Sequence, residues 1–188
     1  MNTTLAQQLD FFYEKHGYGE EGGINNDWIW LKFRYFSLPI PNLKGRRENV
    51  WRHDMLHILL DYDTSWRGEA KVAGWVMGSG GWGNFYVAWL FALSMFSVGM
   101  IFFPLATFQG FVRGRHSRSP YLLGIQKSTL FQGSINDLKR EFLFDKSDFK
   151  TTSKDIAIFG RWILVVFVWI SLPILAFFLF FYLLNNIL

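Results

Sequence analysis

The last 27 residues of the chain, 162–188, contain no charged side chain. A helix needs about 20 apolar residues to cross a bilayer, so we predict a transmembrane helix over residues 156–188. Arg161 and Trp162 are typical of the interface between lipid and water, and Pro173 should kink the helix, which a membrane helix tolerates. A soluble core helix of this kind would need an apolar surface on every side. The rest of the chain is too short to supply one, so we expect a membrane protein.

Composition is consistent with lipid as a second solvent, and it restricts the chemistry. Hydrophobic residues make up 51% of the chain and aromatic residues 20%, more than in an ordinary soluble domain. The chain has no cysteine, so disulfides, thiolate metal sites and cysteine nucleophiles are excluded. Any metal ion bound by this chain therefore takes nitrogen and oxygen ligands.

A second uncharged run of 24 residues extends from Phe85 to Phe108. At about 1.5 Å of rise per residue it is long enough to span a bilayer as a helix. Gly99 and Pro104 interrupt it. A spanning helix, a re-entrant or interfacial helix, and a lipid-facing core helix all fit this pattern. We treat 85–108 as a separate segment that is membrane-embedded or spanning.

The regions on either side of this run differ in charge. Residues 1–84 hold nine Lys or Arg and ten Asp or Glu, whereas residues 109–161 hold ten and five, so the second region carries ten minus five, or +5. A basic segment between two apolar runs suits an anionic membrane surface. It carries no fingerprint of a nucleic-acid-binding module, so we expect no nucleic-acid partner. By the positive-inside rule, residues 109–161 should lie on the cytoplasmic side.

Apolar spacing predicts further helices outside the two runs. Thr3 or Thr4 is a candidate N-cap for a short helix in the N-terminal region, 1–84. That helix should bury one stripe, formed by Leu5, Leu9, Phe12 and Tyr13. Within the basic segment 109–155, the alternation over Ser134–Phe144 predicts a soluble or interfacial helix.

Strand signals are weak along the whole chain. The aromatic stretch Trp28–Ile40 is the main candidate, and we expect Pro39 and Pro41 to end it. We therefore predict an all-α fold: a compact helical bundle with a membrane-embedded helix and a C-terminal transmembrane helix.

The strongest chemical feature is a group of histidines and carboxylates. His53, Asp54 and His57 are spaced i, i+1, i+4, so a helix places the two histidines one turn apart on one face, with Asp54 beside them. Turn-forming residues follow, and a second helix then carries Glu69 in its first turn. A short connection makes the two helices antiparallel neighbours, so Glu69 can face the histidines. We predict a divalent-metal site with the ligands His53, Asp54, His57 and Glu69.

Two imidazoles with carboxylate oxygens suit zinc or another first-row divalent ion. The same spacing also fits a solvated or hydrogen-bonded histidine pair, with Asp54 bonded to the backbone. Asp61 is either a further ligand or a residue at the helix end. His16 and His116 stand apart from the pair, and we interpret them as polar contacts.

The motif resembles that of the coenzyme Q (ubiquinone) biosynthesis protein four family, which is HDxxH, eleven residues, then Glu. Here it reads His53-Asp54-Met55-Leu56-His57, eleven residues, Glu69. A weaker similarity to the family lies in Gly114–Arg118, followed by Leu138–Glu141. Together these similarities cover roughly residues 45–145.

This resemblance implies an all-helical, membrane-associated protein that binds a divalent metal, with zinc expected, through the motif residues. It also implies a prenylated quinone precursor as ligand. The implied role is removal and replacement of the ring carboxyl group at C1, or organisation of the other quinone-biosynthesis enzymes that do so. Arg113, Arg115 and Arg118 are candidates for contacts with the anionic head group, or with lipid phosphates instead.

Three functions stay open. The first is a metal-dependent oxidative decarboxylase or lyase of a prenylated benzoate, in which Glu69 or Asp54 moves a proton. The second is a lipid-binding scaffold with a structural metal, and the third is a metal-dependent hydrolase of a lipid phosphate. Zinc supplies no electrons, so an oxidative step needs oxygen with a redox metal, or a partner protein.

The family resemblance also bears on topology. Family members are peripheral proteins, whereas this chain ends in a predicted transmembrane helix. Because the metal motif and the Gly114–Arg118 phrase belong to one helical domain in the family, we favour residues 85–108 being embedded without carrying residues 1–84 across the membrane.

Overall fold

In the computed structural model, which describes every residue except 1–2, 33–34, 85, 143, 145–149 and 188, the first helix is α1 (Leu5–His16). Thr4 is its N-cap, and its hydroxyl accepts a hydrogen bond from the Gln7 N–H. The Gln7 side chain accepts one from the Thr4 N–H, which completes a capping box. The predicted stripe is confirmed, because Leu5, Leu9, Phe12 and Tyr13 are all buried.

A short 3-10 helix, η1 (Glu20–Gly22), leads to an antiparallel hairpin of β1 (Trp28–Lys32) and β2 (Ser37–Pro41). Trp30 pairs with Pro39, and Trp28 pairs with Pro41. The expectation that Pro39 ends the strand was wrong. Proline cannot donate to a ladder, but each strand of a two-stranded sheet has an open edge where no donor is needed.

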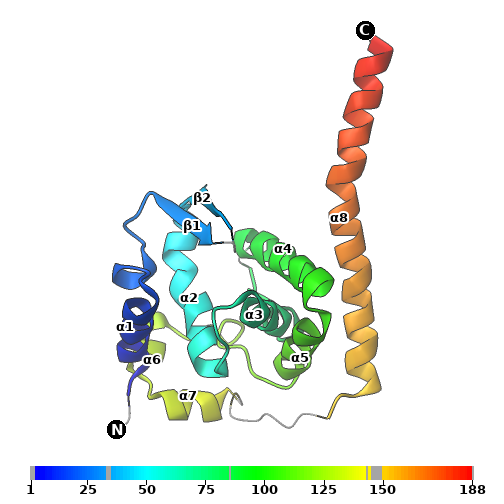
Figure 1. Ribbon diagram of the computed structural model, residues 1–188. Coiled ribbons are helices and arrows are strands. Elements are labelled where there is room, and N and C mark those ends of the chain that lie inside the picture. Colours follow the sequence, from blue (N-terminus) through cyan, green and yellow to red (C-terminus); the bar gives the residue numbers. More distant parts are fainter. Residues whose placement is uncertain (1–2, 33–34, 85, 143, 145–149, 188) are drawn as a thin grey trace.

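The other helices follow in chain order and dominate the structure (Figure 1): α2 (Lys44–Leu60), α3 (Trp66–Gly78), α4 (Tyr86–Phe102), α5 (Pro104–Arg115), α6 (Lys127–Gln132), α7 (Ile135–Glu141) and α8 (Ser153–Ile187). The prediction of an all-α fold is confirmed, since 70% of the structure is helical. Helix α7 lies within the predicted range 134–144, with Ser134 as its N-cap. Leu56, Trp75, Phe96 and Phe111 bring the fully buried core together from α2, α3, α4 and α5.

The apolar run 85–108 forms two helices instead of one. Phe103 leaves helical geometry, with φ −137° and ψ 50°, and Pro104 starts α5. The residue before a proline is disfavoured in the helical region, which explains the break. Helix α4 has 17 residues, whereas a helix needs about 20 residues to cross a bilayer. The run 85–108 therefore does not form a single spanning helix.

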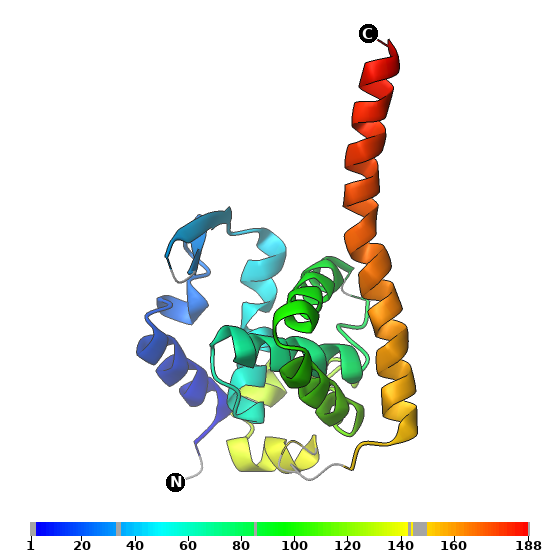
Figure 2. The same ribbon diagram turned by 45° about the vertical axis from the view of Figure 1, so that its right-hand side comes forward.

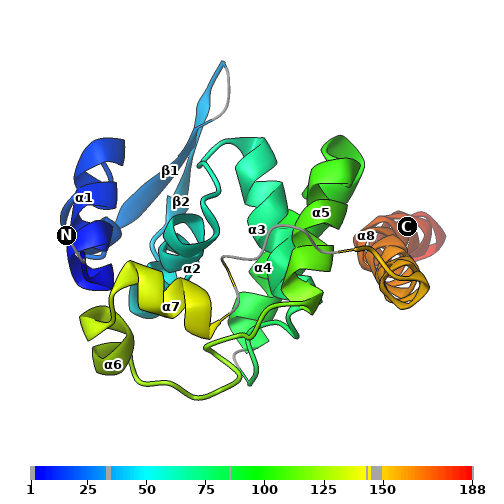
Figure 3. The same ribbon diagram turned by 90° about the horizontal axis from the view of Figure 1, so that it is seen from below.

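Helices α3 and α5 lie side by side (Figure 3), and glycines line the contact between them, which we call the glycine seam. A Cβ atom added at Gly74 would lie 2.2 Å from the Thr107 carbonyl oxygen, and one at Gly110 would lie 2.1 Å from the Lys71 carbonyl oxygen. Gly78 and Gly114 extend the seam by one turn on each helix, with equally close backbone neighbours. The two backbones therefore touch directly, which only the absence of side chains permits.

The start of α8 is fixed to the end of α5. The carboxylate of Asp155 is buried and accepts hydrogen bonds from the Thr152 N–H (3.0 Å) and hydroxyl (2.7 Å). It also accepts one from Arg115 Nε at 3.2 Å and lies 3.2 Å from His116 Nε2. These contacts cap α8 and set the direction in which it leaves the bundle.

The first part of α8 packs on the bundle and the last part extends past it (Figures 1 and 2). The ring of Phe159 lies 5.1 Å from that of Phe111, and the ring of Trp162 lies 6.4 Å from that of Trp89. Large apolar side chains from Leu172 to Leu184 are exposed. Within the described residues, α8 is the one helix that is long and apolar enough to cross a membrane.

The glycine seam predicts a large effect of one methyl group. Gly110→Ala should lower the free energy of unfolding by about 1–3 kcal/mol or more, because its Cβ meets backbone that cannot rotate away. The matched control is Gly160→Ala in α8, which has no atom within 4 Å of the added Cβ and should be neutral or slightly stabilising. Thermal unfolding of detergent-purified variants measures both. Equal stability of the two variants would contradict direct backbone contact.

Candidate metal centre

Helix α2 carries the histidine pair near its C-terminal end. His53 and His57 lie one turn apart, with ring centroids separated by 4.9 Å. The helix ends at Leu60, and its C-cap Asp61 adopts the left-handed conformation at φ 56° and donates its N–H to the His57 carbonyl. The backbone that follows His57 is therefore held close to the histidine itself.

A tight turn brings α3 back against α2. The Asp63 carboxylate accepts from the Ser65 N–H at 2.8 Å, and the Ser65 hydroxyl accepts from the Gly68 N–H at 3.2 Å. A Cβ at Gly68 would lie only 1.8 Å from the Asp63 carbonyl oxygen, so this position requires glycine. The turn places Glu69 in the first turn of α3, as predicted.

Three side chains with metal-ligating atoms converge between the two helices. The Nε2 atoms of His53 and His57 lie 3.2 Å apart. One carboxylate oxygen of Glu69 lies 3.2 Å from His53 Nε2, and the other lies 3.3 Å from His57 Nε2. An ion bound tetrahedrally at zinc–nitrogen distances holds two nitrogens about 3.3 Å apart. His53, His57 and Glu69 are thus arranged as they would be around a divalent ion.

The tautomer of His57 follows from its other ring nitrogen. His57 Nδ1 lies 3.1 Å from the Tyr62 carbonyl oxygen, which only accepts hydrogen bonds, so Nδ1 carries the proton. Neutral His57 then presents the lone pair of Nε2 to the cluster. A backbone carbonyl that orients a histidine in this way is a common partner of metal ligands.

The two histidines differ in exposure. The His57 side chain is buried, whereas 38% of the His53 side chain is exposed. Phe12 covers the His57 ring with a stacked contact, at 6.1 Å between centroids. Solvent therefore reaches the cluster from the His53 side.

Electrostatics couple His53 to Glu69. Burial lowers the pKa of His53, but the charge of Glu69 and its hydrogen bond outweigh burial and raise the pKa to about 9. Burial alone would raise the pKa of Glu69, but the two imidazoles hold it well below its usual range. Without a metal, the cluster holds an ion pair between the His53 imidazolium and the Glu69 carboxylate.

The structure does not bring Asp54 into this cluster. Successive helical residues point in different directions, so the i+1 residue does not share the i, i+4 face. Asp54 is buried, and burial raises its pKa, partly offset by the charges of His53, His57 and Arg46. Asp54 acts on Tyr13 of α1 instead: burial and the charge of Asp54 raise the pKa of the buried Tyr13 side chain.

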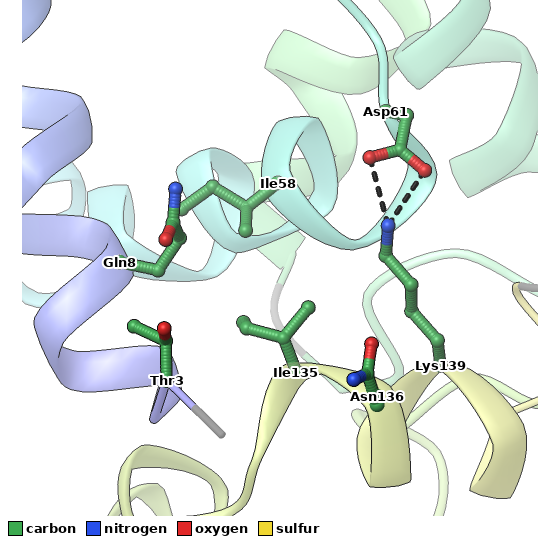
Figure 4. A pocket seen from close by; sticks show the side chains of 7 residues that line it. All are labelled: Thr3, Gln8, Ile58, Asp61, Ile135, Asn136 and Lys139. Carbon is green, nitrogen blue, oxygen red and sulfur yellow. Dashed lines mark hydrogen bonds and ion pairs between the residues drawn. The ribbon is translucent and has the colours of Figure 1, made fainter. Parts of the chain in front are cut away.

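Asp61 is a helix-end residue and takes no part in the cluster. Both of its carboxylate oxygens accept from Lys139 Nζ of α7, at 2.7 and 2.6 Å (Figure 4). This ion pair borders a hollow of about 270 Å³ between α1, α2 and α7, lined also by Ile58 and Ile135. The interpretation of Asp61 as a residue at the helix end is the one that the structure supports.

The three candidate head-group arginines do not converge on one site. Arg113 donates to the carbonyl oxygens of Leu60, at 2.7 Å, and of Phe144, and its guanidinium lies over the Tyr62 ring. Arg115 binds Asp155. Arg118 is exposed. Arg113 thus binds the backbone at Leu60 and the ring of Tyr62, whose carbonyl orients His57.

Sequence reasoning did not identify Tyr62 or Phe12 as parts of the site. Tyr62 acts through its backbone carbonyl, which any residue supplies, so no side-chain pattern could have indicated it. Phe12 belongs to the predicted apolar stripe of α1, and only the packing of α1 on α2 brings it to His57. His116 contacts Asp155 as a polar contact residue, whereas the ring of His16 packs on the ring of Phe12 at 4.6 Å between centroids.

Over its described residues, the chain is a helical protein with one membrane-length helix and a cluster of two histidines and one carboxylate. No protein-family model, no curated protein and no solved structure matches the chain. The resemblance to the coenzyme Q biosynthesis family stays a prediction, which rests on the motif from His53 to Glu69 and on the weaker similarity at Gly114–Arg118.

The pairing of His53 with Glu69 predicts a measurable titration in metal-free protein. Glu69→Gln should lower the pKa of His53 from about 9 toward its ordinary value of 6.5, because it removes the charge that opposes burial most strongly. NMR titration of the His53 ring measures this shift.

The same pair should make the stability of the metal-free protein depend on pH. The raised His53 pKa gives stabilisation that is full below 6.5 and is lost as pH rises toward about 9. Glu69→Gln should abolish this loss between pH 6.5 and 9. Identical pH profiles for wild type and Glu69→Gln would show that the two side chains do not interact.

Proposed function

We propose that this is a membrane-bound, metal-dependent protein of ubiquinone or related prenylated-quinone biosynthesis, acting at the C1 carboxyl position of a prenylated aromatic precursor. The observation that carries the metal part is the convergence of His53, His57 and Glu69 within 3.2–3.3 Å. The substrate part rests on the family resemblance of the same residues. The proposed localisation is a bilayer crossed by α8, with residues 109–161 on the cytoplasmic side.

The donor set narrows the choice of metal. Three protein ligands leave positions open for water or substrate. Two histidines and one carboxylate suit catalytic zinc, and they also suit the non-haem iron of oxygenases. The exposed edge of His53 supports an open site over a closed structural one, and therefore supports an enzyme over a scaffold.

The chain's own groups have distinct roles in this proposal. His53, His57 and Glu69 would hold the ion, which supplies Lewis acidity toward a ring carboxylate or phenolate. Glu69 is fully ionised because of its low pKa, so it serves as a ligand. Asp54 is buried with a raised pKa, so it is the better group to hold and move a proton near the site.

Electron balance separates the open functions. Replacing a ring carboxyl group by a hydroxyl group releases carbon dioxide and oxidises the ring by two electrons. Molecular oxygen with a redox-active metal, or a partner enzyme, must accept those electrons. A zinc protein would instead be a scaffold for other quinone-biosynthesis enzymes or a hydrolase of a lipid phosphate, so metal identity decides between these functions.

Metal content is the direct test. Detergent-purified wild type should contain about one divalent ion per chain, and His57→Ala and Glu69→Ala should lose it. Asp54→Asn is the matched control from the same helix and should retain the ion. Extraction of the same samples should yield a prenylated aromatic compound by mass spectrometry. Folded wild type without metal after reconstitution with zinc or iron would refute the metal-dependent function.

Metal affinity should depend on pH through His53. A bound ion must displace the His53 proton, so the apparent affinity should rise about tenfold per pH unit from neutral pH toward the His53 pKa of about 9 and then level off. Competition with a chelator at several pH values measures this slope. A pH-independent affinity would mean that His53 is not a ligand.

A further inference from the structure

The β1–β2 hairpin exposes apolar side chains on both faces. Trp28 is 55% exposed and Trp30 is 59% exposed on one face, where Pro39 and Pro41 lie opposite them. Leu38 is exposed on the other face. A two-stranded hairpin in water is at best marginally stable, and an antiparallel sheet normally has one polar face. A hairpin with two apolar faces therefore fits apolar surroundings.

Helix α4 continues this apolar surface. Its exposed side chains include Tyr86, Leu90, Phe91, Ile101 and Phe102. Figure 1 shows the hairpin and α4 at the end of the bundle toward which α8 runs. In Figure 3, where α8 is seen nearly end-on, the hairpin is seen lengthwise, so it lies across the direction of α8.

The packing of α8 against α4 determines the depth at which this apolar surface would lie in a bilayer that α8 crosses. Trp162, the first residue of the uncharged part of α8, packs its ring against Trp89 and Phe96 of α4, at 6.4 and 6.2 Å. Helix α4 therefore lies where the uncharged part of α8 begins. Exposed apolar residues from Leu172 onward extend past the bundle.

The chemistry of the hairpin is that of a membrane interface. Tryptophan and tyrosine are enriched at the level of lipid head groups because their rings are amphipathic. The sequence of residues 28–41 includes Lys32 and Arg34 and no acidic residue, which suits anionic phosphates. The run 85–108 carries no charge at all.

We propose that the β1–β2 hairpin and the exposed face of α4 form a membrane-binding surface, which inserts into the interfacial layer of the same bilayer that α8 crosses. The protein then contacts the membrane through the hairpin, through α4 and through α8, instead of through α8 alone. This proposal requires α8 to be a membrane anchor and does not depend on the metal or the substrate.

The absence of native cysteine allows single nitroxide labels to test this in the full chain. Leu38→Cys and Ser37→Cys place a label on each face of the hairpin, because Ser37 shares the face of Trp30. Phe177→Cys in the exposed part of α8 is the lipid reference. Glu141→Cys at the end of α7, at the opposite end of the bundle, is the water reference.

In nanodiscs with anionic lipid, relaxation by oxygen relative to a water-soluble nickel chelate reports the depth of each label. Labels at Leu38 and Ser37 should show a several-fold higher ratio than Glu141, in the direction of Phe177. In the W28Q/W30Q variant, the label at Ser37 should move toward the ratio of Glu141.

Three outcomes would overturn the proposal. Hairpin labels as accessible to nickel as Glu141 would mean that the hairpin is in water. Labels shielded from both reagents would mean that protein covers it, as in a dimer. A label at Phe177 that stays accessible to nickel would show that α8 is no anchor. None of these outcomes affects the metal content of the wild type, so this proposal and the metal function can fail separately.

Discussion

The direct backbone contact between α3 and α5 is the constraint on which the other parts of the structure depend. This contact requires the absence of side chains at four positions, Gly74, Gly78, Gly110 and Gly114. Helix α3 carries Glu69 in its first turn, and α5 carries Arg113 near its last turn, where the guanidinium binds the end of α2. The next basic residue, Arg115, binds the start of α8. One close-packed helix pair therefore fixes the carboxylate of the site, the backbone beside its histidines and the direction of the terminal helix.

The cluster of His53, His57 and Glu69 is asymmetric, and the asymmetry has a physical cause. His57 is buried, covered by Phe12 and held in one tautomer by the Tyr62 carbonyl, so its Nε2 atom faces the cluster in a fixed orientation. His53 is reached by solvent and pairs with Glu69. An incoming ion or ligand would therefore reach His53 before His57. The proton that an ion would displace is the one on His53, where solvent can accept it.

Residue patterns predicted the features that depend on a single helix or turn. They missed the features that depend on contacts between several elements. The pair His53 and His57 follows from helical periodicity, and Glu69 follows from a short turn between two helices. The same periodicity should have separated Asp54 from the pair, since neighbouring residues do not share a face. The stretch Trp28–Ile40 was named as the main strand candidate, but the second strand, which contains Pro39, was not predicted, because its prolines occupy positions where a two-stranded sheet needs no donor. The arginines were assigned by charge alone, whereas their partners, such as Leu60 and Asp155, come from distant segments that no local pattern reveals.

Helix α2 begins at Lys44, directly after the hairpin, and runs from there into the bundle (Figure 1). His53 is nine positions after Lys44 in this helix, which corresponds to about 14 Å of rise. Helix α2 therefore sets the distance between the hairpin and the cluster. If the proposed prenylated precursor binds with its aromatic ring at His53, the ring would lie about this far from the hairpin, and its tail would have to extend over this distance to reach lipid there. Tail length would then select substrates, because a short-tailed analogue would gain no contact with the bilayer.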